Sequence, residues 1–169
     1  MILVFFSFIS HTAFYLGDRY LISLETVHGN SGAPNILEGD ILLRDIYRSN
    51  DIRRSDLISV RLDARFNNKS ISKRVIGFEG ETIEIKNGSI YINGEKIQTE
   101  PIASVKYTLD STCLFGLEPY TIPKGKLYVL GDNSEHSTDS RQLGPIDRSR
   151  IDGKYCKILW PLSRIRKLS

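Results

Sequence analysis

Two Asn-Gly dipeptides, Asn87-Gly88 and Asn93-Gly94, constrain the fold of this chain more than any other local feature. Both central residues of a type I′ turn have positive φ, which asparagine and glycine tolerate best, and this turn joins antiparallel strands. Between residues 82 and 97, isoleucine also recurs at alternate positions around the two turns, as it does in half-buried strands. The segment therefore predicts a β-meander of three short strands.

Short apolar runs separated by turn residues continue through the rest of the chain, and few stretches have helical periodicity. We expect further strands at residues 41–43, 57–60, 74–76, 126–130 and 154–160. No internal repeat or low-complexity linker interrupts this pattern. A chain of 169 residues is of a size for one domain, and we predict a mostly β fold of antiparallel sheets.

The charge distribution restricts the kinds of partner. A hydrophobic content of 40%, a charged content of 25% and a net charge of +3 are typical of a globular protein. The basic residues form pairs and one short patch at residues 164–167, not a dense face with interleaved aromatics, so nucleic-acid binding is not expected. This patch suits either contact with anionic lipid or a solvated chain end. The two cysteines have no metal-ligand spacing, and we expect no metal.

The first residues differ from the rest of the chain. Residues 1–17 are apolar almost throughout, and His11 is their only side chain that can carry charge. A membrane-spanning helix needs about 20 apolar residues, so the run is slightly short. It lacks the basic start and small-residue cleavage site of a secretory signal peptide. We favour a short or start-truncated helical membrane anchor over residues 1–20; the alternative is a buried first element of a soluble domain.

Three polar segments, far apart in the sequence, contain the candidate chemistry. The first, residues 27–40, places Ser31 in a glycine-flanked loop that by itself resembles ordinary turn chemistry. The second, residues 72–81, begins with Lys73 and an apolar strand; burial there would lower the pKa of the lysine and leave it neutral enough to act as a base. The third, residues 130–141, is rich in glycine, carboxylates, hydroxyls and arginine. The polar groups of this segment must form hydrogen bonds with one another or with a substrate.

In this order the three segments resemble the characteristic boxes of bacterial type I signal peptidases, the serine–lysine proteases of family S26. The resemblance runs from about Val27 to Ile165. The matching positions are Ser31, Pro34, Gly39 and Asp40 in the first box, Lys73, Arg74, Val75, Gly77, Gly80 and Glu81 in the second, and Gly131, Asp132, Asn133, Ser137, Asp139, Ser140, Arg141 and Gly144 in the third. The third box is the most specific, because its positions agree without a gap. Two positions depart from the family pattern: Gly32 replaces a methionine and Asn35 a threonine.

The resemblance implies a role for each matching residue. Ser31 would be the nucleophile, Lys73 the general base, and Ser137 the hydroxyl that orients the lysine amine. Gly29 agrees with those members that have glycine two residues before the nucleophile. Asp139 and Arg141 would form an ion pair that holds the third box together, and Asp132 and Asn133 would support this box. No cofactor is implied.

A substrate and a location also follow from the resemblance. The substrates would be preproteins carrying signal peptides, with small residues such as alanine at the first and third positions before the cut, bound as an added β-strand. The protein would be a monomer in the plasma or inner membrane, in contact with lipid. Residues 1–20 would be a single-pass anchor and residues 21–169 a signal-peptidase-like catalytic domain outside the cytoplasm. Two alternatives stay open: a related peptidase with a narrower role, in pilin processing or self-cleavage, and a catalytically impaired binding protein on the same fold.

Overall fold

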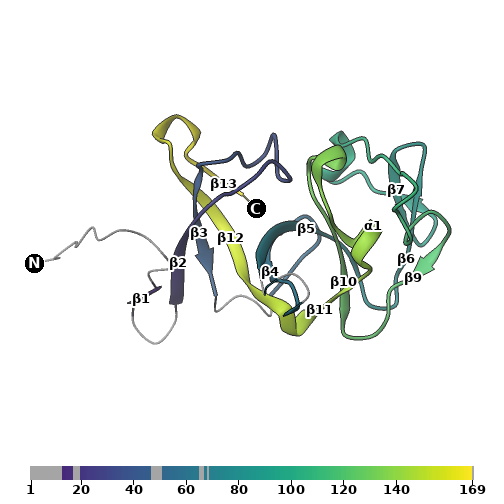
Figure 1. Cartoon of the computed structure of the whole chain (residues 1–169), viewed down its shortest axis with the longest axis horizontal. Helices are drawn as coiled ribbons and strands as arrows, with labels where there is room; N and C mark the ends of the chain where they lie inside the picture. Colours follow the sequence, from purple (N-terminus) through teal and green to yellow (C-terminus); the bar gives the residue numbers. More distant parts are fainter. Residues whose placement is uncertain (1–12, 17–19, 47–50, 65–66, 68, 169) are drawn as a thin grey trace, which may run out of the picture.

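The computed structural model describes residues 13–16, 20–46, 51–64, 67 and 69–168. For the described residues up to 21, only the backbone is described. The strands of this part of the chain form two antiparallel sheets (Figure 1). Their bounds are β1 Ala13–Leu16, β2 Tyr20–Thr26, β3 Ile41–Asp45, β4 Leu57–Arg61, β5 Ser70–Phe78, β6 Thr82–Lys86, β7 Ser89–Ile92, β8 Glu95–Lys96, β9 Tyr120–Thr121, β10 Lys126–Leu130, β11 Ile146–Asp147, β12 Ile151–Trp160 and β13 Arg166–Lys167. The α-helix is α1, Ser140–Leu143. Short 3₁₀ turns lie at Ile102–Ser104, Ser134–His136, Arg148–Arg150 and Leu162–Arg164.

The larger sheet has the order β1-β2-β3-β12-β4-β5-β10-β11, and β13 also pairs with β12. Its central strand, β12, comes from near the end of the chain and lies between β3 and β4, which joins the two halves of the sheet. Register shifts interrupt the pairing of β12 with both neighbours and the pairing of β10 with β5. Shifts of this kind bend a strand and increase its twist. The sheet is therefore curved, not flat (Figure 1).

The smaller sheet has the order β8-β7-β6-β9 and contains the predicted meander. Asn87 and Gly88 have φ of 51° and 78°, and Asn93 and Gly94 have φ of 52° and 83°. These positive values are those that a type I′ turn requires. Both hairpins are confirmed, and the five other expected strands correspond to β3, β4, β5, β10 and β12.

The N-terminal helix is not confirmed. Residues 1–12 and 17–19 of the expected anchor lie outside the described residues. The part that is described, Ala13–Leu16, forms strand β1 and pairs antiparallel with β2. Among the described residues, no helix is both long enough and apolar enough to cross a membrane.

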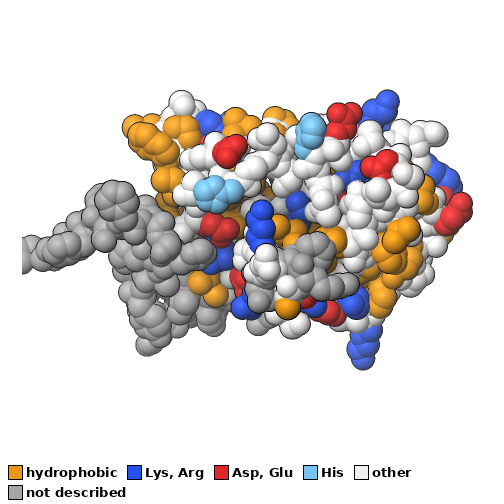
Figure 2. All heavy atoms as spheres, in the orientation of Figure 1, with side chains coloured by type: hydrophobic (Ala, Val, Ile, Leu, Met, Phe, Trp, Pro, Cys, Tyr) orange, Lys and Arg blue, Asp and Glu red, His pale blue; other side chains and the backbone are white. Residues whose placement is uncertain are grey.

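An exposed apolar patch lies at the connection between β12 and β13. Trp160, Leu162 and Ile165 are 51%, 69% and 44% exposed. In Figure 2, apolar side chains gather at the end of the molecule where Figure 1 places this connection. Arg164 and Arg166 lie within the same segment, so the patch combines apolar and basic groups.

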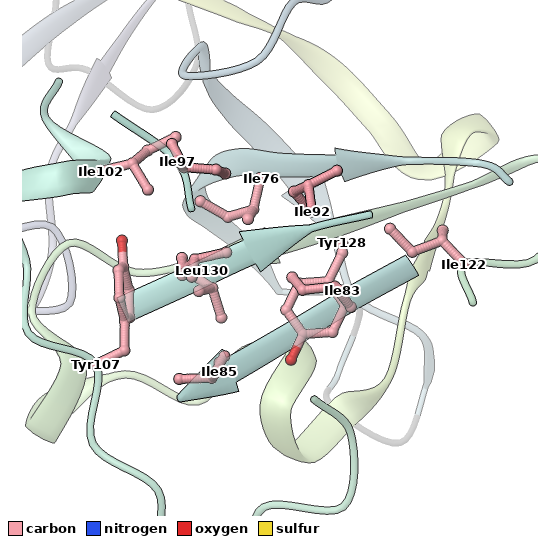
Figure 3. Close-up of a cluster of buried hydrophobic side chains, with 11 residues drawn as sticks. Ile76, Ile83, Ile85, Ile92, Ile97, Ile102, Tyr107, Ile122, Tyr128 and Leu130 are labelled. Carbon is pink, nitrogen blue, oxygen red and sulfur yellow. The ribbon is translucent and has the colours of Figure 1, made fainter. Parts of the chain in front are cut away.

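The core between the two sheets holds the strands that carry the candidate site. Ile76 of β5, and Tyr128 and Leu130 of β10, pack against Ile83 and Ile85 of β6 in one buried cluster (Figure 3). Burying an aliphatic side chain of this size contributes about 1.5–3 kcal/mol. The packing fixes β5 and β10 against the smaller sheet at the points where the second and third boxes begin.

Candidate active site

Lys73 lies in the middle of β5 and is 2% exposed. Burial disfavours the charged form of the amine and lowers its pKa from 10.5 to about 8, although the carboxylates of Asp139 and Asp132 act in the opposite direction. Among the described residues, no hydrogen bond or ion pair engages its Nζ. At pH 7 about a tenth of such amines are neutral, against less than about a thousandth of ordinary lysines. A lysine in this state can accept a proton.

The third box folds around the ion pair between Asp139 and Arg141. Arg141 Nε donates to Asp139 Oδ1 at 2.9 Å and its Nη2 donates to Oδ2 at 3.0 Å, with both side chains buried. Asp139 also caps α1 by accepting from the Arg141 backbone N–H. The Ser137 hydroxyl donates to Asp139 Oδ2 at 2.7 Å. The Ser134 hydroxyl oxygen and carbonyl accept from the guanidinium as well. The expected ion pair is therefore present, and it holds Ser137 in place.

Asp132 and Asn133 connect the third box to the other two. Asp132 accepts from Arg74 Nε at 2.6 Å and again from Nη2, which fixes the box to β5 beside Lys73. Its Oδ2 also accepts from the Asn35 side chain at 3.0 Å. The Asn133 backbone N–H donates to the Ser31 carbonyl at 3.0 Å. These contacts bring the three sequence segments together at one place.

Gly131 is the point of closest approach. A Cβ at this position would lie 2.2 Å from Ser137 Oγ and 2.7 Å from the Ser31 carbonyl oxygen. Real Cβ atoms do not come this close to other atoms, so only glycine fits without a shift of the neighbouring segments. The absence of a side chain allows the Ser31 loop and Ser137 to pack on the same backbone.

The Ser31 loop is held from several sides. Gly29 has φ of +83°, a conformation that glycine adopts without strain. A Cβ on Gly32 would lie 2.2 Å from Cγ1 of Ile36, so the buried side chain of Ile36 fills the space beside Gly32. Asp40 closes the loop by accepting from the Leu37 backbone N–H at 2.9 Å and from Arg164 Nε at 2.9 Å.

A groove of about 620 Å³ starts at Ser31 and runs between β2 and the first residues of β5. β10 pairs with β5 only from Arg74 to Phe78. The edge of β5 from Ser70 to Lys73 that faces away from β4 therefore has no strand partner in the described part of the sheet. The lining residues are Leu24, Glu25, Thr26, Val27, His28, Gly29, Ser31, Gly32, Ile36, Leu42, Lys69, Ser70, Ile71, Ser72 and Tyr155. An extended peptide can add to such an edge by backbone hydrogen bonds.

Comparisons with known proteins identify the family of this chain. The family model described as "Signal peptidase, peptidase S26" matches residues 1–160. The chain belongs to the peptidase S26 family. It is 34% identical to signal peptidase I of Bacillus licheniformis, over 90% of this chain and 82% of that protein. It is 31% identical to signal peptidase IB of Staphylococcus aureus, over 90% and 85%. A crystal structure of signal peptidase I from Enterococcus faecalis is similar with a TM-score of 0.51 at 32% identity, covering 61% of this chain and 95% of that one.

Contacts among the described residues join the three boxes of this S26 peptidase, and some of these contacts differ from those that the resemblance implied. Asp132 accepts a hydrogen bond from Asn35, and Asn133 donates one to the Ser31 carbonyl. These two residues therefore support the Ser31 loop as well as their own box. Asn35, one of the two departures, participates in this bracing. Ser137 donates to Asp139; no hydrogen bond joins it to Lys73 among the described residues.

Sequence reasoning did not identify several polar residues that line the groove of this S26 peptidase, among them Glu25, Ser72 and Tyr155. In the sequence, Glu25 and Ser72 look like ordinary solvent-facing residues of strands. Tyr155 looks like an ordinary core residue. No local signal distinguishes them, because three different strands bring them together. Among the described residues, no group of three or more histidine, cysteine, aspartate or glutamate side chains is arranged to hold a metal ion.

Proposed function

We propose that this S26 peptidase removes signal peptides from exported preproteins with Ser31 as nucleophile and Lys73 as general base. The observation that carries the proposal is a buried lysine with a pKa of about 8 on the strand that Asp132 ties to the Ser31 loop. Each of these features is needed for a serine–lysine mechanism, and the family relationship makes the same activity the expected one.

In the acylation step, Ser31 Oγ forms a bond to the scissile carbonyl carbon while its proton passes to neutral Lys73 Nζ. The Ser31 backbone N–H can donate to the oxyanion; losing a donor of this kind typically costs about 10²–10³ in rate. The tetrahedral intermediate then collapses, the C–N bond breaks, and Lys73 returns the proton to the leaving amine. Water next attacks the ester with Lys73 again as base, which releases the signal peptide as a carboxylate and restores Ser31.

Ser137 is proposed as the residue that orients the amine. Its hydroxyl has one proton and two lone pairs, and the proton is already donated to Asp139. Its lone pairs remain available to accept a hydrogen bond from Lys73 Nζ. This arrangement would direct the nitrogen lone pair toward the nucleophile when a substrate closes the site.

Substrate binding by strand addition is supported by the open edge of β5 and by the groove beside it. Side chains of an extended peptide alternate, so the first and third residues before the cut face the same wall. Preproteins with small residues at these two positions are the proposed substrates. No cofactor takes part in the proposed steps.

A membrane location is expected for a member of this family, and we place the catalytic domain on the extracytoplasmic side, with the protein as a monomer. We do not place a single-pass anchor over residues 1–20, because Ala13–Leu16 form β1 and pair with β2. The apolar patch with Trp160 and Leu162 supports contact with lipid. Arg164 links this patch to the Ser31 loop through Asp40. A domain that rests on the bilayer by this patch would hold the active site close to the membrane surface, where signal peptides are cut.

The test is cleavage of a model precursor with Ala-x-Ala before the junction, in detergent, by the wild type and by the Ser31→Ala and Lys73→Ala variants. We expect cleavage by the wild type alone, at the predicted junction by mass spectrometry, with a rate that rises with pH through about 8. Equal cleavage by Ser31→Ala would exclude the proposed nucleophile. Binding without cleavage by the wild type would instead favour the impaired binding protein.

A further inference from the structure

Asn35 is held at both ends by residues that lie outside its own loop. Its side-chain amide donates to Asp132 Oδ2 at 3.0 Å. Its backbone carbonyl accepts from Nη2 of Arg166 at 2.6 Å and from Nη2 of Arg164 at 3.3 Å. These arginines lie 131 and 129 positions after Asn35 in the sequence, so they join the C-terminal segment to the loop that carries Ser31.

Arg164 also anchors the far end of the Ser31 loop. Its Nε donates to Asp40 Oδ1 at 2.9 Å and its Nη2 donates to Oδ2 at 3.0 Å, which makes the pair bidentate. Burial raises the pKa of the Asp40 carboxyl, but the hydrogen bonds from Arg164 and from the Leu37 N–H outweigh it and hold this pKa below its usual range. Asp40 is therefore charged at every pH at which Lys73 can act as a base, and the anchor is present throughout.

Apolar packing joins the same two segments. Ile36 is 1% exposed and belongs to a buried cluster that includes Ile158 of β12. Leu168 packs against this cluster, and its N–H donates to the Cys156 carbonyl at 3.0 Å. β13 also pairs with β12 (Figure 1). These contacts fix the backbone that carries the two arginines, so their guanidinium groups meet the loop from a defined position.

The arginines reach the loop from outside the groove. Ser31 and Gly32 are among the residues that line the groove, whereas Arg164, Arg166 and Asn35 are not. The family model matches residues 1–160, and both arginines lie beyond this match. A substitution of either arginine would therefore shift the loop without removing a side chain that lines the groove.

We propose that Arg164 and Arg166 are positioning residues of this peptidase. By holding the loop at two points, they fix the place of Ser31 relative to Lys73. The inference rests on the proposed function and extends its site to the C-terminal segment. The Ser31 hydroxyl must lie within hydrogen-bond reach of the lysine amine for its proton to pass. Because a displacement of about 1 Å can cost about 10² in rate, a loop held at two points is a condition for fast cleavage.

The test is steady-state cleavage of the Ala-x-Ala precursor in nonionic detergent, where no anionic lipid competes for the arginines. Arg166 is exposed, so Arg166→Gln should fold normally by circular dichroism. We expect its kcat to fall about fivefold, the effect of one hydrogen bond, with KM changed by less than about twofold. Arg164→Gln should lower kcat about 10²-fold, because the loop also loses its anchor at Asp40. An unchanged kcat in both variants would overturn the inference.

Conservative substitutions distinguish positioning from a general loss of structure. Arg166→Lys keeps the charge and a donor for the Asn35 carbonyl, and its kcat should lie within about twofold of the wild-type value. Arg164→Lys cannot form the bidentate pair with Asp40, so it should recover only part of the loss. If the lysine variants are no more active than the glutamine variants, the arginines do not act through these hydrogen bonds and the inference is wrong.

Lys157→Gln is the matched control. Lys157 lies on β12 where this strand pairs with β13, and among the described residues no hydrogen bond or ion pair joins it to the Ser31 loop. The substitution removes one positive charge from the same part of the molecule and should keep the wild-type kcat. Equal losses in Lys157→Gln and Arg166→Gln would mean a general effect of charge and would contradict the positioning role.

Hydrogen exchange separates this inference from the proposed catalysis. In Arg166→Gln, the amides of residues 30–40 should exchange about fivefold faster than in the wild type, while those of β12 stay unchanged. If the wild type cleaves nothing but this local change is present, the proposed function fails and the contact with the loop stands. If the wild type cleaves and its kcat responds to neither arginine substitution, the proposed function stands and this inference fails.

Discussion

Replacing Lys73 by methionine should stabilise the fold while abolishing cleavage. The folded protein holds the Lys73 proton less tightly than the unfolded chain does, because burial lowers the pKa from 10.5 to about 8. The unfolded state therefore binds more protons between these two values, and wild-type stability rises with pH across this window. A shift of this size corresponds to about 3 kcal/mol, at about 1.4 kcal/mol per pH unit. Methionine has a similar length and no charge, so Lys73→Met removes this cost.

The measurement is urea unfolding of both proteins at a series of pH values. At pH 7 the variant should be more stable by about 3 kcal/mol, or about 6–12 °C in Tm for a chain of this size. The gain should fall to about 1 kcal/mol by pH 10, because the folded wild type has by then lost the proton, while about three-quarters of the unfolded chains still carry it. Lys69→Met is the control: Lys69 is an exposed lysine near the start of β5, and its replacement should leave stability nearly unchanged at every pH.

Two results would refute this reasoning. A variant less stable than the wild type at pH 7 would mean that Lys73 contributes favourable interactions that exceed its desolvation. A gain that does not depend on pH would mean that methionine packs better than the lysine stem, and that the amine is not the source of the cost.

Three further substitutions test the contacts that hold the three boxes together. Gly131→Ala forces the Ser31 carbonyl and Ser137 apart, and we expect kcat to fall about 10²-fold in the precursor assay, with folding retained by circular dichroism. Arg141→Met leaves the Asp139 carboxylate buried and unpaired, which should cost about 3–5 kcal/mol in urea unfolding. Arg74→Gln frees Asp132 to attract the Lys73 amine, so the midpoint of the rate–pH profile should move above its wild-type value; an unchanged midpoint would contradict the pairing argument.

The sequence predicted those parts of the fold that depend on short-range chemistry. The two Asn-Gly turns define the smaller sheet locally, because each turn fixes the register of the strands on either side. The alternating apolar runs located five further strands. The resemblance identified residues that do lie together, since Asp132, Asn133 and Gly131 all contact the segments of the other boxes.

The sequence could not predict features that depend on long-range pairing. The position of β12 between β3 and β4 joins residues about a hundred positions apart, and no local pattern specifies such a partner. The lining of the groove by Tyr155 depends on this placement, because Tyr155 pairs with Arg44 of β3. The expected N-terminal helix was inferred from apolar content alone, and apolar content does not distinguish helix from strand where Ala13–Leu16 forms β1.

The low pKa of Lys73 depends on how the two nearby carboxylates are paired. Asp132 and Asp139 both raise this pKa, and an unpaired carboxylate beside a buried lysine would hold the amine in its charged form. Each carboxylate instead has its own buried arginine, Arg74 or Arg141. These arginines take up the negative charge that would otherwise bind the lysine, so desolvation remains the larger effect. The ion pairs that assemble the third box thus also leave Lys73 able to accept a proton near neutral pH.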